Sequence, residues 1–356
     1  MDYGVAVATT TDSWKVVKRA EELGFTHAWF YDTQLLNPDV FMAMTQAAMV
    51  TSRIRLGTGV LIPSNRIEPV AANCLATLNK LAPGRVDFGV GTGFTARRTM
   101  GLDAVRQKRF REYIERVQAL LRGETIEWDF EGEQRKIAFL NPDYGFITLD
   151  TPETPIPLHI SGFGPKTRRL AAEMGAGFLN YTADVPRAVR DLAEVHGSWR
   201  EAGREGLPYS TLFTMGCVLD DDEPADSNRC MAQAGPFAAV AFHNLVETTT
   251  AESAAQLKLP PLMAEALERY RALHAAYDPD APWLRNHRGH LMKLREEERA
   301  IVTGDLVRML AFVGTEDELR ERVATIAEGG YSQLTVQVVE GEFDAIDDWA
   351  RVFGLA

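Results

Sequence analysis

The chain has 356 residues, 46% of them hydrophobic, and can bury a sizeable core as one large domain or two ordinary ones. Its net charge of −12 and isoelectric point of about 5.2 argue against a nucleic-acid-binding or anionic-membrane-binding surface. The three separated cysteines give no zinc signal, and the sequence has no signal-peptide pattern or membrane-length apolar run, so we expect a cytoplasmic protein.

The first third of the chain alternates between short apolar runs and amphipathic segments. Strands are predicted at 3–8, 26–31, 54–62 and 85–90, with helices between them at 12–23, 40–50 and 69–81. Strands separated by helices of this length form right-handed βαβ units, which predicts a parallel sheet.

The same alternation continues through the rest of the chain, with two interruptions. Further strands are predicted at 158–160, 177–181, 209–219 and 334–339, and further helices at 103–121, from 165, at 186–202, from 315 and at 343–353. Residues 124–149 interrupt the rhythm with alternating apolar residues and glycines, which suggest a small β insertion. Residues from about 220 to 313 are helical and charged, and this segment is too long for a loop.

Eight strands alternating with helices predict an α/β fold of the (β/α)8 TIM-barrel type. We expect residues 1–356 to form a single domain, with the β insertion 124–149 after strand four and a helical lid at about 220–313 after strand seven. The alternative is an open doubly wound sheet. The strand count and the lack of a GxGxxG turn after the first strand favour the barrel.

In a barrel, functional side chains lie at the C-terminal ends of the strands. Strand two ends at Asp32, which is either a buried functional acid or a turn cap. Strands three and four end in glycines, at 57–59 and 91–93, which either let backbone approach a large flat ligand or only make room for packing. Arg97 and Arg98 follow strand four and, with its glycines, form a candidate anion site.

Strand five runs into a turn of mostly small residues at 161–164, and Pro165 then begins an amphipathic helix. Glycines allow close backbone approach, and free N–H groups at the positive end of the helix dipole attract anions. Lys166 adds positive charge at this end. The pattern indicates an anion site, most simply for phosphate. The alternative is an ordinary strand-to-helix turn with surface arginines.

Two histidines in the predicted lid, His287 and His290, are candidate catalytic residues because histidine transfers protons near neutral pH. The alternative is a solvated helix end. No third ligand cluster appears on the strand ends, so no metal site is predicted. Tyr113, on the helix after strand four, lies beside the apolar stripe of that helix, as core aromatics do.

The chain resembles the bacterial luciferase-like superfamily of flavin- (FMN) and coenzyme F420-dependent oxidoreductases. The resemblance covers nearly the whole length and is strongest at 20–32, 54–73, 84–93, 160–178 and 314–323. It implies a (β/α)8 barrel with a flavin or deazaflavin ring lying across the strand ends.

The resemblance also implies a non-proline cis peptide at Gly59-Val60 and a phosphate held by residues 162–166. The cofactor contacts that it implies are Gly59, Val60, Gly91, Thr92, Gly93, Tyr113, Ser161, Gly162, Phe163, Gly164, Pro165 and Lys166. Many relatives have an acidic residue followed by histidine at the end of strand two, but here Thr33 follows Asp32. A histidine from the lid is therefore the candidate replacement.

The leading hypothesis is a monooxygenase that uses reduced FMN and O2 to oxygenate a small organic substrate under the lid. In this reading Asp32 orients substrate or shuttles a proton, and a separate flavin reductase supplies the reduced flavin. The first alternative has the same fold but uses coenzyme F420 for hydride transfer, with Arg97 and Arg98 serving its longer acidic tail. The second is a non-catalytic flavin-binding paralogue. The resemblance further suggests a homo-oligomer.

Overall fold

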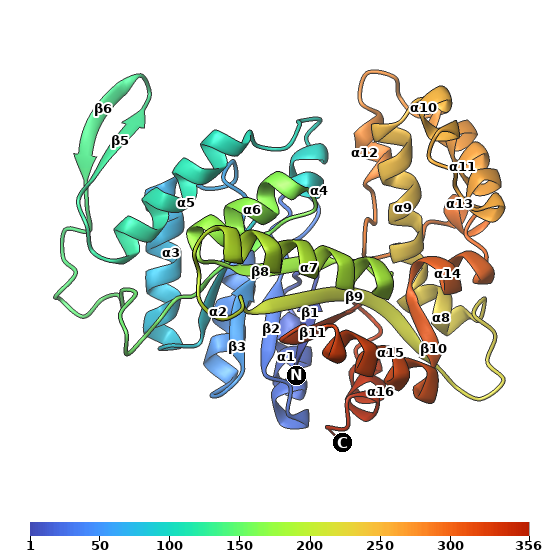
Figure 1. Ribbon diagram of the computed structural model, residues 1–356, viewed down its shortest axis with the longest axis horizontal. Helices are drawn as coiled ribbons and strands as arrows, with labels where there is room; N and C mark the ends of the chain where they lie inside the picture. Colours follow the sequence, from blue (N-terminus) through green and yellow to red (C-terminus); the bar gives the residue numbers. More distant parts are fainter. Residues whose placement is uncertain (356) are drawn as a thin grey trace.

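The computed structural model describes residues 1–355, and its centre is a closed parallel barrel (Figure 1). Within these residues, eight strands pair around the ring, and β11 pairs with both β9 and β1 to close it. In ring order they are β1 (Asp2–Val7), β2 (His27–Phe30), β3 (Arg55–Thr58), β4 (Val86–Val90), β7 (Leu158–Ser161), β8 (Gly177–Tyr181), β9 (Ser210–Leu219) and β11 (Gln333–Val338). The predicted (β/α)8 barrel is therefore confirmed.

Helices surround this ring. Each strand presents alternate residues to opposite faces, so one set of side chains packs under the helices and the other points into the barrel. Their bounds are α1 (Ser13–Leu23), α2 (Val40–Val50), α3 (Glu68–Leu81), α5 (Gln107–Leu121), α6 (Pro165–Met174), α7 (Val185–Glu201), α15 (Glu316–Glu328) and α16 (Ala345–Val352). On β2, Ala28 and Phe30 belong to the main apolar core, whereas Trp29 belongs to a smaller cluster with Ala6 and Phe213. The barrel thus has an outer core under the helices and an inner plug of aromatic side chains.

A glycine on β3 makes room for this inner plug. A Cβ atom at Gly57 would lie 2.4 Å from Cε3 of Trp29, far inside van der Waals contact. Gly57 therefore has a packing role.

The lid stands beside the barrel mouth, on the opposite side of the molecule from the hairpin of β5 (Ile126–Phe130) and β6 (Glu133–Ile137) (Figure 1). It has its own apolar cluster, which includes Phe242 and Tyr270. The lid helices are α8 (Asn228–Gln233), α9 (Gly235–Thr248), α10 (Ala251–Ala255), α11 (Pro261–His274), α12 (Pro282–Asn286), α13 (Glu296–Arg299) and α14 (Gly304–Leu310).

Two element boundaries differ from the sequence prediction by more than two residues, and one short helix was not predicted. The strand predicted at 54–62 ends at Thr58. The peptide bond between Gly59 and Val60 is cis, as expected from the resemblance. Residues 94–98 form a short helix, α4 (Phe94–Arg98). The helix predicted to begin at 103 begins at Gln107, because Val105 instead donates its N–H to the carbonyl oxygen of Thr92 at 2.8 Å.

An additional strand was missed at the end of the lid. β10 (Phe312–Thr315) pairs in parallel with the far half of β9, Gly216–Leu219, outside the barrel ring. Four residues directly before a helix give too short a period-two pattern to recognise. The capping box that follows was predicted correctly, since Thr315 caps α15 through the backbone N–H of Glu318.

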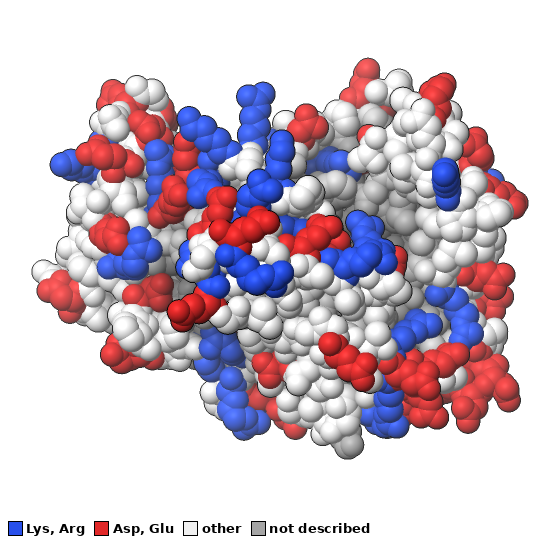
Figure 2. All heavy atoms as spheres, viewed as in Figure 1, with Lys and Arg blue, Asp and Glu red and all other residues white. Residues whose placement is uncertain are grey.

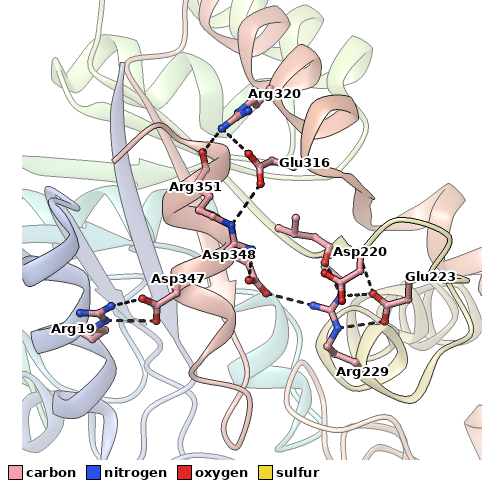
Figure 3. Close-up of polar contacts among 11 residues, drawn as sticks. Arg19, Asp220, Glu223, Arg229, Glu316, Arg320, Asp347, Asp348 and Arg351 are labelled. Atoms are coloured by element: carbon pink, nitrogen blue, oxygen red, sulfur yellow. Dashed lines mark hydrogen bonds and ion pairs between the residues drawn. The ribbon is translucent and has the colours of Figure 1, made fainter. Parts of the chain in front are cut away.

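Ion pairs fasten the base of the lid to the closing helices of the barrel (Figure 3). The Arg229 guanidinium on α8 contacts Glu223 and lies 3.3 Å from Asp348 on α16. Asp348 also pairs with Arg351 at 2.6 Å, and Arg351 lies 3.5 Å from Glu316 on α15. The start of the lid is therefore held to both C-terminal helices. Over residues 1–355, no helix combines the length and apolarity that crossing a membrane requires.

Candidate active site

A cavity of about 260 Å³ opens at the C-terminal ends of the barrel strands, under the lid. Its wall brings together most of the residues predicted from the sequence, although these come from four separate strand ends and from the lid. The predicted residues that line it are Asp32, Gly59, Val60, Gly91, Thr92, Gly93, Ser161, Phe163, Gly164 and His290. The residues that the strand-end rule selected therefore line one continuous cavity.

Glycines shape this cavity in two ways. A Cβ atom at Gly91 would lie 2.7 Å from Cγ2 of Val60, so glycine is needed for the two strand ends to pack. Gly93 has a φ of +85°, a backbone conformation that residues with a side chain rarely adopt. Gly164 differs: a Cβ there would meet no protein atom within 4 Å. Its missing side chain leaves open space at the cavity wall.

Asp32 is buried at this wall and is held by two partners. Its Oδ1 lies 2.8 Å from Nη1 of Arg66, and its Oδ2 accepts a hydrogen bond from Asn65 at 3.2 Å. Burial raises the pKa of Asp32, and the charge and hydrogen bond of Arg66 only partly oppose this. Asp32 is thus a buried carboxylate that is already paired.

The sides of the cavity carry tyrosines that the sequence analysis did not select. The hydroxyl groups of Tyr31 and Tyr181 both donate to Oε1 of Gln337, at 3.0 and 3.1 Å. Burial raises the pKa of each tyrosine, so both remain protonated donors at neutral pH. Gln337 in turn donates to the carbonyl oxygen of Leu291 in the lid, at 2.6 Å.

The two lid histidines have different surroundings. Both are buried, so the alternative of a solvated helix end is wrong. His290 lines the cavity, and its Nε2 lies 3.2 Å from Oγ1 of Thr95. His287 lies outside the lining, with its Nε2 2.8 Å from Oε1 of Glu247 on α9. Only His290 is placed to meet a ligand in the cavity.

The arginines after strand four do not form the candidate anion site. Arg98 lies 3.4 Å from Glu247 and stacks over the ring of Phe94, with its Cζ 3.8 Å from the ring centroid. Arg97 donates to the carbonyl oxygen of Asp103. Both guanidinium groups are engaged with the protein, and Arg98 joins the barrel to the lid.

The turn after strand five borders the cavity with part of its length. Ser161, Phe163 and Gly164 line the wall together with Thr167, whereas Gly162, Pro165 and Lys166 lie just outside the lining. Gly164 is the N-cap of α6 and supplies no capping side chain, so the helix N-terminus has no side-chain acceptor of its own. This end of the helix suits an anionic group.

Tyr113 lies away from the cavity wall. It is fully buried in the outer core, and its hydroxyl group has no hydrogen-bond partner among the described residues. The structure therefore places it where a core aromatic belongs.

A wider groove of about 1060 Å³ continues from the cavity between the lid and α7. Phe94, Tyr181 and His290 line both spaces. Figure 2 shows a hollow beside the lid with basic side chains along its edge, and the groove lining includes Arg187 and Arg308. The lid wall of the groove is mostly apolar. The cavity is therefore reached through a passage large enough for a substrate.

Some site residues escaped the sequence analysis for identifiable reasons. Tyr31, one residue before Asp32, and Asn180 and Tyr181, at the end of β8, follow the strand-end rule that found the others. His243 and Glu298, which contact each other behind His290, lie on α9 and α13, and no local pattern relates them to the cavity. Only tertiary packing brings those two together.

Comparison with known proteins agrees with this fold. The sequence profile of a family described as luciferase-like monooxygenases matches residues 4–333. The chain is 28% identical to the 5,10-methylenetetrahydromethanopterin reductase of Archaeoglobus fulgidus over 323 residues, which cover 89% of this chain and 86% of that protein.

Two further similarities are shorter or limited to the fold. The chain is 40% identical over 139 residues to the F420-dependent glucose-6-phosphate dehydrogenase of Beutenbergia cavernae, a match that spans 37% of this chain and only 39% of the dehydrogenase. The coenzyme F420-dependent tetrahydromethanopterin reductase of Methanopyrus kandleri shares the fold with a TM-score of 0.68, at 19% identity over 98% of this chain and 97% of that one. The family match spans most of the described barrel, and the chain belongs to the luciferase-like monooxygenase family.

Proposed function

We propose that the protein is an oxidoreductase that uses coenzyme F420 to transfer a hydride to or from a small molecule bound in the cavity. The observation that carries this proposal is the cavity wall itself, which is backbone at Gly59, Gly91, Gly93 and Gly164. A broad flat ring can lie against backbone without displacing side chains. The similarity to proteins named for F420 favours a deazaflavin over FMN.

The residues around the cavity fit such a cofactor. The open space at Gly164 and the uncapped N-terminus of α6 suit the phosphate of its side chain, with the Thr167 hydroxyl beside them. The bound deazaflavin would supply the hydride chemistry. The protein would orient the ring, exclude water beneath the lid and manage the proton that accompanies the hydride.

A reduced-FMN monooxygenase is the second candidate, favoured by the description of the matching family. This reading also needs O2 and a flavin reductase as partners. The same cavity would hold the FMN ring, so the two candidates are separated by cofactor preference.

The deciding experiment is an anaerobic titration of the purified protein with F420, followed by its fluorescence, and separately with reduced FMN, followed by absorbance. The proposal expects F420 to bind at least ten-fold more tightly and the complex with reduced F420 to be unreactive when oxygen is admitted. Tighter binding of reduced FMN, with a flavin–oxygen adduct after mixing with O2, would overturn it in favour of the monooxygenase. Binding of neither would remove the cofactor assignment.

A glycine variant links this titration to the cavity. In Gly164→Ala the added methyl group meets no protein atom, so folding is expected to be preserved while the methyl takes up cofactor space. We expect F420 affinity to fall by roughly ten-fold, a loss typical of one misplaced methyl group. Gly197→Ala, whose Cβ on helix α7 also meets nothing within 4 Å, is the matched control and should bind like the natural protein.

A further inference from the structure

A chain of hydrogen bonds runs from the interior of the lid to the cavity. Glu298 on α13 accepts from Nε2 of His243 on α9 at 2.7 Å. Nδ1 of His243 lies 3.0 Å from Nδ1 of His290. Nε2 of His290 then lies 3.2 Å from the hydroxyl oxygen of Thr95 at the cavity wall. Glu298, His243 and His290 are all buried.

The first member of the chain is a carboxylate. Burial alone would raise the pKa of Glu298, but hydrogen bonds from His243 and Arg295 and the charge of Arg295 outweigh it and lower that pKa to about 2. Its Oε1 also accepts from the hydroxyl of Tyr270 at 2.7 Å, and its Oε2 from the backbone N–H of Arg295 at 2.9 Å. An ionised carboxylate can only accept hydrogen bonds, so Nε2 of His243 must carry a proton.

The proton on Nε2 of His243 determines the proton positions on the rest of the two histidine rings. Burial lowers the pKa of His243, which keeps the ring neutral, so its Nδ1 is a lone pair. The contact at 3.0 Å then requires the other Nδ1, that of His290, to be the donor. Burial and the nearby His243, His287 and Arg98 lower the pKa of His290 well below its usual value. A neutral His290 with its proton on Nδ1 has its lone pair on Nε2, where it accepts the hydroxyl proton of Thr95 at 3.2 Å.

We propose that Nε2 of His290, acting through the hydroxyl group of Thr95, is the proton acceptor for the hydroxyl group of an alcohol substrate, and that His243 and Glu298 are positioning residues that fix this tautomer. The proposal rests on the function proposed above and names its substrate class. In the oxidation direction, the C–H bond of the carbinol carbon breaks and its electron pair leaves as hydride to the deazaflavin. The O–H proton passes to Oγ1 of Thr95 as the Thr95 hydroxyl gives its own proton to Nε2 of His290, and a C=O bond forms.

The same contacts let the positive charge that forms on His290 move to His243. After Nε2 takes a proton, His290 can pass its Nδ1 proton to Nδ1 of His243 across the 3.0 Å contact. The imidazolium then lies on His243, directly against the Glu298 carboxylate at 2.7 Å. A cation beside a buried carboxylate is stabilised far more than one facing an apolar cavity. The proton thus moves away from the reacting carbon without crossing solvent.

The other acid–base groups near the cavity are less suited to this role. Asp32 is held by Arg66 at 2.8 Å and by Asn65. His287 lies outside the cavity lining, with its Nε2 against Glu247. The Tyr31 and Tyr181 hydroxyls are donors to Gln337 with raised pKa values. His290 is the group whose unprotonated ring nitrogen meets a hydroxyl group of the cavity wall, that of Thr95.

The tautomer can be measured without cofactor or substrate. Protein labelled with ¹⁵N in its histidine rings is examined by NMR between pH 6 and 8, because protonated and unprotonated ring nitrogens resonate far apart. We expect His290, assigned by its loss in His290→Gln, to show a protonated Nδ1 and an unprotonated Nε2 throughout this range. In His243→Phe the acceptor for Nδ1–H is lost, and the Nε2-protonated tautomer should become populated. A protonated Nε2 in the natural protein, or an unchanged tautomer in His243→Phe, would overturn the proposal.

Activity supplies the second test, and F420 fluorescence titration separates its two possible failures. If the natural protein does not bind F420, the proposed function fails. If F420 binds but a panel of primary, secondary and sugar alcohols gives no F420 reduction, the alcohol assignment fails. With an alcohol that reacts, His290→Gln is expected to lower kcat by 10²–10⁴-fold, the usual range for a lost general base, with F420 affinity within two-fold of the natural value.

The test of Glu298 as a positioning residue uses the pH profile of kcat, which a purely structural role would leave unchanged. Glu298→Gln removes the charge that stabilises the imidazolium, so we expect kcat to fall by at least ten-fold and the pH profile of kcat to shift. The lid histidine His274, which lies outside both the cavity and groove linings, provides the control His274→Gln, with an expected unchanged profile. An unchanged kcat and pH profile in Glu298→Gln would remove Glu298 from the proposal.

Discussion

Gln337 on the last barrel strand donates a hydrogen bond of 2.6 Å to the carbonyl oxygen of Leu291 in the lid. Leu291 follows His290 directly and has a positive φ of 60°. The barrel interior therefore fixes the backbone of the segment that carries the cavity histidine. Because Gln337 also accepts from Tyr31 and Tyr181, this one amide joins three parts of the cavity wall.

The first prediction concerns this amide. Gln337→Leu leaves two tyrosine hydroxyls and one carbonyl without their partner, so we expect a loss of about 1–3 kcal/mol in the free energy of unfolding. Chemical denaturation measures the loss, and hydrogen exchange should show faster opening around residues 289–293. Gln134→Leu, on the exposed strand β6, is the control and should stay within about 0.5 kcal/mol. Equal stability of both variants would contradict the bridging role.

The second prediction concerns Asp32 and the cation that opposes its burial. A carboxyl group whose folded pKa is raised favours folding at low pH, and this contribution disappears as pH rises through the folded pKa. Arg66→Met removes the opposing charge and should raise the pKa of Asp32 further, so Tm should fall more steeply between pH 4 and 8 than in the natural protein.

Asp32→Asn added to Arg66→Met provides the control, because it removes the titrating group. The double variant should lose the extra pH dependence. If Arg66→Met and the double variant show parallel Tm curves, Asp32 is not the group that responds to Arg66.

The third prediction concerns pH dependence from the opposite end of the barrel. Burial lowers the pKa of His27, at the start of β2, to about 4. A histidine with a depressed folded pKa supports folding above its unfolded pKa of about 6.5, and that support is lost as pH falls toward 4. The shift corresponds to a loss on the order of 3 kcal/mol across this interval. Urea denaturation at pH 7, 5.5 and 4.5 measures it, and His27→Gln should flatten this part of the profile.

The fourth prediction concerns the ion pairs at the base of the lid (Figure 3). Arg229 is partly buried between Glu223 and Asp348, whereas Arg320 pairs with Glu316 at 2.6 Å on an exposed surface. Arg229→Ala should cost about 1–3 kcal/mol in the free energy of unfolding, and Arg320→Ala less than about 1 kcal/mol, because exposed pairs gain little in water. Equal losses measured by urea denaturation would argue that the Arg229 contacts do not anchor the lid.

The sequence by itself determined the barrel and most of its mouth. The period of apolar residues identified all eight strands of the barrel ring, and the strand-end rule then placed Asp32, Gly91 and Gly164 at one site. These predictions succeed because they depend on local patterns and on a single geometric fact, that parallel strands in a barrel end at the same rim. The cis peptide at Gly59-Val60 followed from the family resemblance.

Only the tertiary structure decided which polar groups meet. Arg98, read from the sequence as part of an anion site, is paired with Glu247 of the lid, and Tyr113 is enclosed in the core. His243 and Glu298 are 55 residues apart, yet their side chains touch. Side-chain partners across such separations depend on how helices of the lid pack against one another, and local sequence carries no record of that packing. The hydrogen-bond partners of His290 depend on that packing, so they are evident only in the folded chain.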